Sequence, residues 1–197
     1  MADSQTFEAF VFKNRGALLA VPAAALTIWG KPSAFGIAAG LPIAFAGELL
    51  RCWAVGYSGA TTRGDMVEAP KLVTAGPYAY VRNPLYLANF VTAAGFALAF
   101  TGKNSTLARL SLMAASLGTM FAVYAAIVPH EERFLHEKFG EDFERYCERV
   151  PAVVPQLEPM PDGQGVWNAG VIKEAESNTF TTFAAMLASL ALKALRA

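Results

Sequence analysis

The stretch LVTAGPYAYVRNPLY, residues 72–86, decides how this chain is organised. It begins with a Gly-Pro turn signal, and its last residues, Asn83 to Tyr86, lead directly into an apolar run over 85–101. Asn is a preferred N-cap residue and Pro is tolerated at the first helical position, so a helix is expected to start here. The stretch therefore predicts a polar turn packed against the end of a membrane helix, because exposing such groups to lipid would be costly.

The composition is that of an integral membrane protein. Of 197 residues, 54% are hydrophobic and 16% are charged, whereas soluble domains average about 25% charged residues. Mean hydropathy is +0.35. The formal net charge is zero, which gives no case for nucleic-acid binding because that needs a basic face. We expect one membrane domain over residues 1–197, with no cleavable signal at its polar start.

Four apolar runs over 10–29, 34–57, 85–101 and 106–128 approach the roughly 20 residues that a membrane span requires. They predict an all-α bundle of four to five transmembrane helices. Gly36-xxx-Gly40 allows close helix approach, and we expect it to serve packing within a monomer.

Polar connections over 58–84 and 129–178 join these runs. The second should contain an amphipathic surface helix over 131–150, followed by an extended proline-rich loop. Residues 180–197 form a fifth span or an interfacial helix, and the sequence leaves both open.

The distribution of basic residues predicts the orientation. With the N-terminus inside, the inner segments hold Lys13, Arg15, Arg63, Lys71, Arg82, Arg133, Lys138, Arg145 and Arg149. The outer loops hold Lys31, Lys103 and Arg109. Both polar connections are then expected on the cytoplasmic side, in a bacterial inner membrane or in the endoplasmic reticulum.

Aromatic and cationic side chains are dense around the first turn, at Tyr78, Tyr80, Arg82 and Tyr86. A loop signal at Gly76 and an arginine reaching lipid headgroups explain parts of this pattern. Aromatic faces also attract cations, and a helix N-terminus favours anions. A ligand that carries both a sulfonium or ammonium group and a carboxylate suits the combination.

A second polar junction, Pro129-His130-Glu131-Glu132, follows the fourth apolar run. Acidic residues at a helix start are a sufficient local explanation. The predicted topology nevertheless puts this pair on the same side as Arg82, where a carboxylate can bind an amino group or orient a nucleophile. The sequence therefore predicts that the two junctions converge into one pocket.

Metal and hydrolase chemistry are poorly supported. His130 and His136 are the only histidines, and their spacing does not put them on one helix face. No nucleophile elbow, phosphate loop or dinucleotide fingerprint is present. We expect no bound metal.

Residues 72–86 resemble the signature LVTxGxYxxxRHPxY of the isoprenylcysteine carboxyl methyltransferase and phospholipid methyltransferase superfamily of integral membrane enzymes. The resemblance extends over about 51–155 and includes Arg51-x-Trp53-Ala54, Glu131-Glu132, Leu135, Phe139-Gly140, Tyr146, Val150-Pro151 and Pro155.

The resemblance implies an S-adenosylmethionine-dependent methyltransferase acting on a lipophilic, membrane-embedded acceptor. Arg82 and Glu132 would be catalytic and would orient the acceptor. Cofactor contacts would fall on Pro70, Lys71, Leu72, Val73, Tyr78, Asn83, Pro84, Leu85, Tyr86 and Glu131.

Two positions depart from the family pattern. Asn83 replaces the usual histidine, and an amide does not titrate near neutrality. Ile127 stands where prenylcysteine methyltransferases carry an arginine for the substrate carboxylate. A phospholipid N-methyltransferase therefore stays open as an alternative, as does a non-enzymatic scaffold or transporter-like bundle.

Overall fold

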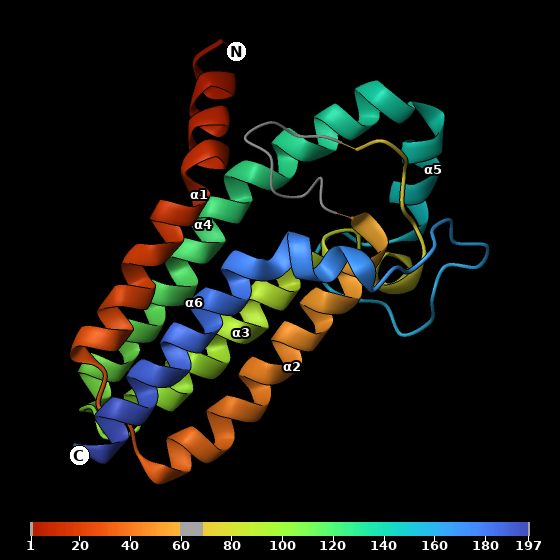
Figure 1. Cartoon of the computed structure of the whole chain (residues 1–197). Coiled ribbons are helices and arrows are strands. Elements are labelled where there is room, and N and C mark those ends of the chain that lie inside the picture. The colour runs from red at the N-terminus through yellow and green to blue at the C-terminus, as the bar shows by residue number, and fades with distance from the viewer. Residues whose placement is uncertain (1, 60–68, 197) are drawn as a thin grey trace.

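A computed structural model describes residues 2–59 and 69–196, with the side chains of residues 2–6 left out. Arg63, counted in the orientation argument, lies outside the described residues. The helices are α1 (Ala2–Trp29), α2 (Ala34–Ser58), η2 (Gly76–Ala79), α3 (Pro84–Thr101), α4 (Thr106–Phe139), α5 (Glu141–Arg149) and α6 (Gly170–Leu195). Every regular element in the described part of the chain is helical, which confirms the predicted all-α class (Figure 1).

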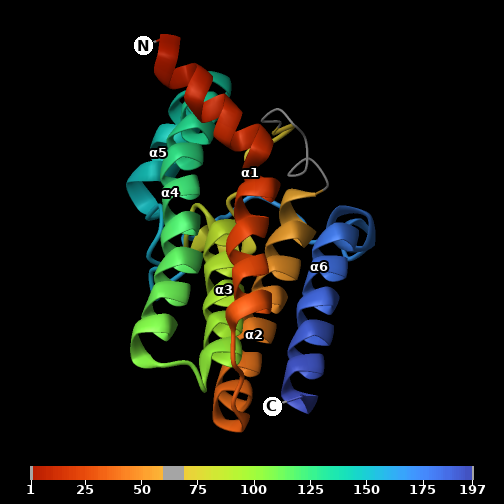
Figure 2. The same ribbon diagram turned by 90° about the vertical axis from the view of Figure 1, so that its left-hand side faces the viewer.

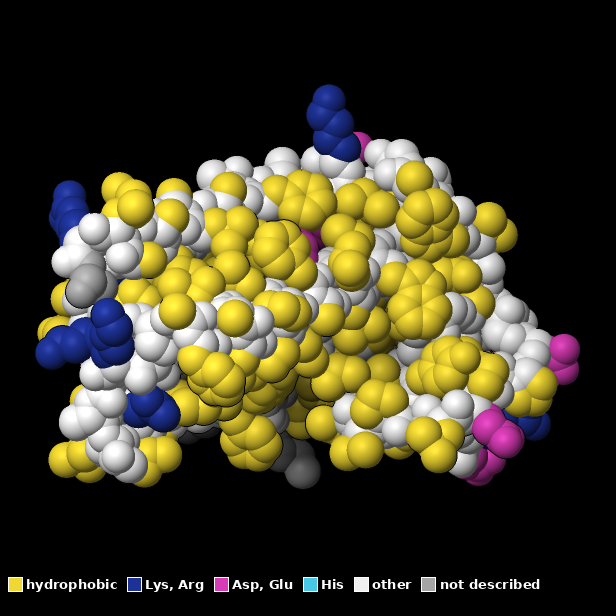
Figure 3. Space-filling model, turned by 90° about the horizontal axis from the view of Figure 1, so that it is seen from below, with side chains coloured by type: hydrophobic (Ala, Val, Ile, Leu, Met, Phe, Trp, Pro, Cys, Tyr) yellow, Lys and Arg dark blue, Asp and Glu magenta, His cyan; other side chains and the backbone are white. Residues whose placement is uncertain are grey.

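Four segments are long and apolar enough to cross a membrane: Phe7–Trp29, Ala34–Ser58, Pro84–Thr101 and Thr106–Phe139. They correspond to the four predicted runs. Hydrophobic side chains spread over much of the face seen in Figure 3, and most of its charged side chains lie at the margins. Such a broad apolar surface suits contact with lipid. The protein is an integral membrane helical bundle.

The helices pack chiefly in two pairs, α2 with α3 and α1 with α4, and α6 lies beside α2 (Figures 1 and 2). The α2–α3 crossing is close because glycines meet there. A Cβ on Gly40 of α2 would lie 2.4 Å from the carbonyl oxygen of Gly95 of α3, and Gly36 of α2 faces Leu98 of α3. The Gly36-xxx-Gly40 motif therefore packs two helices within one chain, as predicted.

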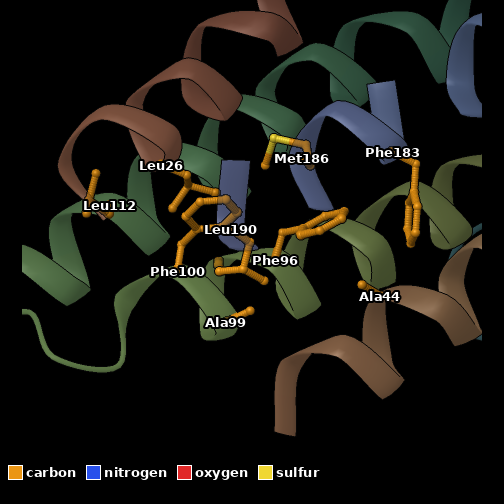
Figure 4. Packing of buried hydrophobic residues seen from close by; sticks show 10 residues of the cluster. Leu26, Ala44, Phe96, Ala99, Phe100, Leu112, Phe183, Met186 and Leu190 are labelled. Carbon is orange, nitrogen blue, oxygen red and sulfur yellow. The ribbon is translucent and has the colours of Figure 1, made fainter. Parts of the chain in front are cut away.

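A buried apolar cluster joins the bundle away from the polar connections (Figure 4). It draws Leu26 from α1, Ala44 from α2, Phe96 from α3, Leu112 from α4 and Leu190 from α6. Because five helices meet in it, this cluster holds the membrane-embedded half of the molecule together.

The prediction that the fourth span ends before Pro129 is wrong. The helix α4 continues through Pro129 to Phe139 and extends past the rest of the bundle (Figure 1). A proline removes one backbone hydrogen bond, and the packing of Ile127 before it and the contacts of Glu131 after it outweigh that loss. The helix break lies at Gly140, with φ 52°, before the short α5. Glu131 therefore lies within a helix, and the helix-start explanation for it fails.

The last helix begins at Gly170, earlier than the predicted position near residue 180. It packs lengthwise against the bundle, with Glu176 fully buried and Leu190 in the core cluster. At its other end, Lys193 Nζ donates to the carbonyl oxygens of Ile28 and Gly30, each at 3.0 Å. α6 is not among the described helices that are long and apolar enough to cross a membrane, so a fifth span and an interfacial helix both stay predictions for residues 180–197.

Candidate functional site

One large cavity, of about 780 Å³, runs between α1, α2, α3, α4 and α6. Its polar end lies where η2, α5 and the long loops gather (Figure 1). That end is lined by Pro70, Lys71, Leu72, Val73, Tyr78, Arg82, Asn83, Pro84, Leu85, Tyr86 and Glu131. These are all the predicted site residues except Glu132, which lies behind Arg82.

The opposite end of the cavity is apolar and reaches into the core cluster. It is lined by side chains from four helices: Leu19, Leu26, Phe96, Met120, Phe183 and Met186. One cavity therefore connects a polar end to an apolar interior. The cavity volume is in the range of pockets that hold small-molecule ligands.

Tyr78 is held in place by its backbone and lines the polar end. Tyr146 Oη, from α5, donates to the Tyr78 carbonyl oxygen at 2.7 Å. Burial raises the pKa of Tyr78 to about 12, partly offset by a hydrogen bond with Ser58. Burial also raises the pKa of Tyr146 far above its ordinary value. Both phenols therefore stay neutral, so Tyr78 offers an aromatic face and a hydroxyl rather than a charge.

Arg82 ties the turn before α3 to α4 and α5. Its Nη2 and Nε lie 2.9 and 3.0 Å from Oε1 of Glu132, and its Nη1 donates to the Val150 carbonyl oxygen at 2.7 Å. A planar guanidinium suits such divided contacts. The two predicted catalytic residues therefore meet, and in this arrangement they fix the geometry of the polar end.

Asn83 and Tyr86 make the remaining contacts between the two junctions. Tyr86 Oη donates to Oε1 of Glu131 at 2.7 Å, which joins α3 to α4 inside the cavity. Asn83 occupies the N-cap position of α3, but its side chain donates to the Ala152 carbonyl oxygen at 3.0 Å and does not cap the helix. The two junctions converge as predicted, whereas the capping role given to Asn83 is wrong.

The loop after α5 braces the tyrosine turn from outside, and sequence reasoning missed this role. Gln156 donates from its backbone to the Tyr80 carbonyl oxygen and from its side chain to that of Ala79, both at 3.0 Å. Further along, the Gln164 carbonyl oxygen accepts from Thr74 N at 2.8 Å. Prolines signalled an extended loop, but nothing in its composition signalled what it would bond.

A buried polar network crosses the cavity wall deeper in the bundle. Arg51 on α2 donates to both carboxylate oxygens of Glu176 on α6, at 2.7 and 3.1 Å, and to Asn89 Oδ1 at 2.7 Å. Asn89 in turn donates to Tyr124 Oη at 2.7 Å. Glu48 lies three residues before Arg51 on α2, but the salt bridge of Arg51 is with Glu176.

The model of the family described as phospholipid methyltransferase matches residues 35–142. This range begins in α2, ends in α5, and includes Arg82, Tyr86 and Glu131. The chain belongs to the phospholipid methyltransferase family. Membership confirms the predicted superfamily and supports the predicted methyltransferase chemistry.

Curated relatives of this phospholipid methyltransferase family member carry two kinds of name. The chain is 37% identical over 90 residues to the nickel-cobalt-cadmium resistance protein NccN of Alcaligenes xylosoxydans xylosoxydans, covering 46% of this chain and 38% of the relative. It is 34% identical over 100 residues to the cobalt-zinc-cadmium resistance protein CzcN of Cupriavidus metallidurans, covering 51% and 42%. It is 30% identical over 120 residues to protein-S-isoprenylcysteine O-methyltransferase B of Arabidopsis thaliana, covering 59% and 57%.

The chain thus spans about half the length of the curated relatives it matches. No solved structure matches it significantly. Within the described residues, no group of three or more His, Cys, Asp or Glu side chains is arranged to hold a metal ion.

Proposed function

We propose that this protein is an S-adenosylmethionine-dependent methyltransferase that acts on a lipophilic acceptor held within the membrane. The observation that carries the proposal is the single cavity, whose polar end is built from the family signature and whose other end is apolar. Such a space brings a water-soluble donor and a lipid-soluble acceptor together, which is the orientation effect that bimolecular transfer requires.

The residues of the polar end fit this cofactor. Tyr78 and Tyr86 present aromatic rings that suit a sulfonium. Glu131 offers a carboxylate for an amino group, and Lys71 at the rim is an exposed cation that suits a carboxylate. The chemistry supplied by the cofactor is displacement at its sulfonium methyl group: the sulfur–carbon bond breaks as a lone pair of the acceptor bonds to that carbon.

The protein's own part is to position and to exclude water. Arg82 and Glu132 keep the turn that carries Tyr78 fixed against α4. Tyr86 orients Glu131 through its hydrogen bond. We assign Pro70, Leu72, Val73, Asn83, Pro84 and Leu85 to the walls of the cofactor site, on the cytoplasmic side of the membrane.

Both oxygen and nitrogen acceptors are compatible with this site. An ionised carboxylate needs no base, whereas an ammonium must lose a proton before it attacks. The relatives named as isoprenylcysteine O-methyltransferases favour the first, and the phospholipid methyltransferase family description favours the second.

Binding of labelled S-adenosylmethionine to the purified protein in lipid nanodiscs tests the proposal. We expect saturable binding that falls at least tenfold in Tyr78→Ala and in Glu131→Ala, because each change removes a contact worth on the order of 1.4 kcal/mol or more. Incubation of the labelled cofactor with membranes then shows whether a lipid or a peptide gains the label.

Two matched variants serve as controls. Tyr80→Ala removes a tyrosine of the same turn whose ring lies tilted against Trp53 outside the cavity, and Glu137→Ala removes an exposed carboxylate farther along α4. Both should bind the cofactor as the wild type does. Absence of binding in the wild type, or equal losses in the controls, would refute the proposal.

A further inference from the structure

Two buried oxygen atoms in the described part of the chain have no hydrogen-bond partner: Oε1 of Glu48 and Oγ of Ser116. The side chains are nearly enclosed, with 8% of Glu48 and 5% of Ser116 exposed. Both residues line the large cavity, Glu48 from α2 and Ser116 from α4. Burying a polar atom without a partner is costly, and this cost is greatest for a carboxylate. A ligand in the cavity is a source of the missing partners.

Glu48 lies well inside the membrane-spanning part of the molecule. It precedes the end of α2 at Ser58 by ten residues, which is about 15 Å along a helix axis. The cavity lining includes the apolar side chain of Phe183 and the polar side chains of Asn89 and Thr92. A carboxylate at this depth would contact the part of a ligand that lies farther into the bundle than the polar end of the cavity.

The nearest cation does not satisfy Glu48. Arg51 is one turn away on the same helix, but its three donor nitrogens are directed to Glu176 and Asn89. Glu176 is fully buried and takes Arg51 with both of its oxygens. Arg51 attracts Glu48 electrostatically but forms no hydrogen bond with its Oε1, and Glu48 lines the cavity without a salt bridge in the described residues.

The cationic side chains of the described lining are Lys13, Arg15, Arg51, Lys71 and Arg82, and among them Arg51 is the one that lies a single turn from Glu48. Ile127 has no charge to offer an anion, and it is fully buried in an apolar cluster with Val11, Phe12 and Tyr124. Arg82, at the polar end, is already bonded to Glu132 and Val150. The unpartnered oxygen of Glu48 itself favours a ligand that donates a hydrogen bond over one that carries a negative charge.

We propose that Glu48 is a specificity-determining residue that receives the hydrogen-bond donor of a lipophilic ligand, an amine or a hydroxyl group on an alkyl chain, and that it excludes carboxylates from the interior of the cavity. The inference rests on the proposed function, since this ligand would be the methyl acceptor or an analogue of it. Glu48 acts by binding and orienting; the transfer step itself belongs to the polar end.

Binding of three single-chain probes to the purified full-length protein in nanodiscs of neutral lipid tests this assignment. Labelled dodecylamine, dodecanol and dodecanoic acid share one chain and differ in the polar group, and empty nanodiscs give the background to subtract. We expect the amine to bind at least tenfold more tightly than the acid, with the alcohol between them. Glu48→Gln should weaken amine binding at least tenfold and should narrow the difference between amine and acid.

Glu174→Gln is the matched control, because it makes the same chemical change on an exposed residue of α6. Its probe binding should equal that of the wild type, and the thermal unfolding midpoint of Glu48→Gln shows whether that variant is folded. Equal binding of amine and acid to the wild type, or unchanged amine binding in a folded Glu48→Gln, overturns the assignment. Glu48-dependent amine binding without any methyl transfer would support the subsite and refute the proposed enzyme activity.

Discussion

Among the arginine–glutamate pairs that join distant segments of this chain, two lie at different levels of the cavity. Arg82 and Glu132 meet at the polar end, where the Glu132 side chain is 27% exposed. Arg51 and Glu176 meet deeper in the bundle, where the Glu176 side chain is fully buried. Both arginines line the same cavity, so the pairs differ in surroundings more than in chemistry.

The difference in exposure suggests that one pair mainly stabilises the fold and the other mainly holds the geometry of the site. In the deep pair, loss of one partner leaves a charge in surroundings of low dielectric constant, so the pair should matter most for stability. At the polar end, water screens the pair and the same arginine also binds backbone carbonyl oxygens of Cys147 and Val150, so its loss should matter most for the geometry of the site. The following variants test this division.

Replacing Glu176 by alanine should have the largest effect on stability. Arg51 would keep Asn89 as an acceptor but lose its only ion pair in the described residues, and α6 would lose its polar link to α2. Uncompensated buried charges cost about 3–5 kcal/mol. We expect a correspondingly lower unfolding free energy in mixed micelles, whereas Glu174→Ala on the exposed side of α6 should change little. Equal unfolding of these two variants would contradict a stabilising role for the deep pair.

Replacing Arg82 by lysine should chiefly impair the site. A lysine retains the charge but cannot reach Glu132 and the Val150 carbonyl oxygen together with a planar fork. We expect the unfolding free energy to fall by about 1–2 kcal/mol and the rate of methyl transfer, measured with labelled cofactor, to fall at least tenfold. If Arg82→Lys lost stability as Glu176→Ala does while retaining its activity, the proposed division would be reversed.

The sequence predicted that the two polar junctions converge, but it predicted neither of these ion pairs. Arg82 and Glu132 belong to junctions that the signature and the topology put on the same side of the membrane. Arg51 and Glu176 are separated by 125 positions, and Glu176 lies in a stretch that the sequence predicted to be a loop. The same reason explains the brace that Gln156 forms on the tyrosine turn: tertiary packing brings these segments together, and neither periodicity nor composition encodes it.

Boundaries were predicted less well than spans. Apolar run length located four spans because the bilayer imposes it. Pro129 was expected to end a helix, but local propensity is a weak guide where a long helix is packed on both sides of a proline. Gly140, whose φ is positive, is where α4 ends.

Replacing Tyr86 by phenylalanine tests the hydrogen bond at the polar end of the cavity without changing the deep pair. The ring and its contact with Tyr124 would remain, and only the hydrogen bond to Glu131 would be lost. A hydrogen bond to a charged group contributes about 1.5–3 kcal/mol, and water in the cavity would replace part of it. We expect cofactor binding to weaken about tenfold, with the unfolding midpoint close to that of the wild type. A variant that binds the cofactor normally would show that Tyr86 does not orient Glu131.

Replacing Arg145 by alanine should have the smallest effect and sets the baseline for both pairs. Arg145 lies on α5 with its side chain 58% exposed, and it pairs with Asp142 and Glu141 on the same short helix. Exposed pairs within a helix contribute about 0.3–0.5 kcal/mol. We expect the unfolding free energy to change by less than about 0.5 kcal/mol, with cofactor binding and methyl transfer unchanged. A larger loss would mean that α5 depends on this surface pair to hold Tyr146 and Val150 against the tyrosine turn. It would also contradict the view that an exposed ion pair contributes less to stability than an enclosed one.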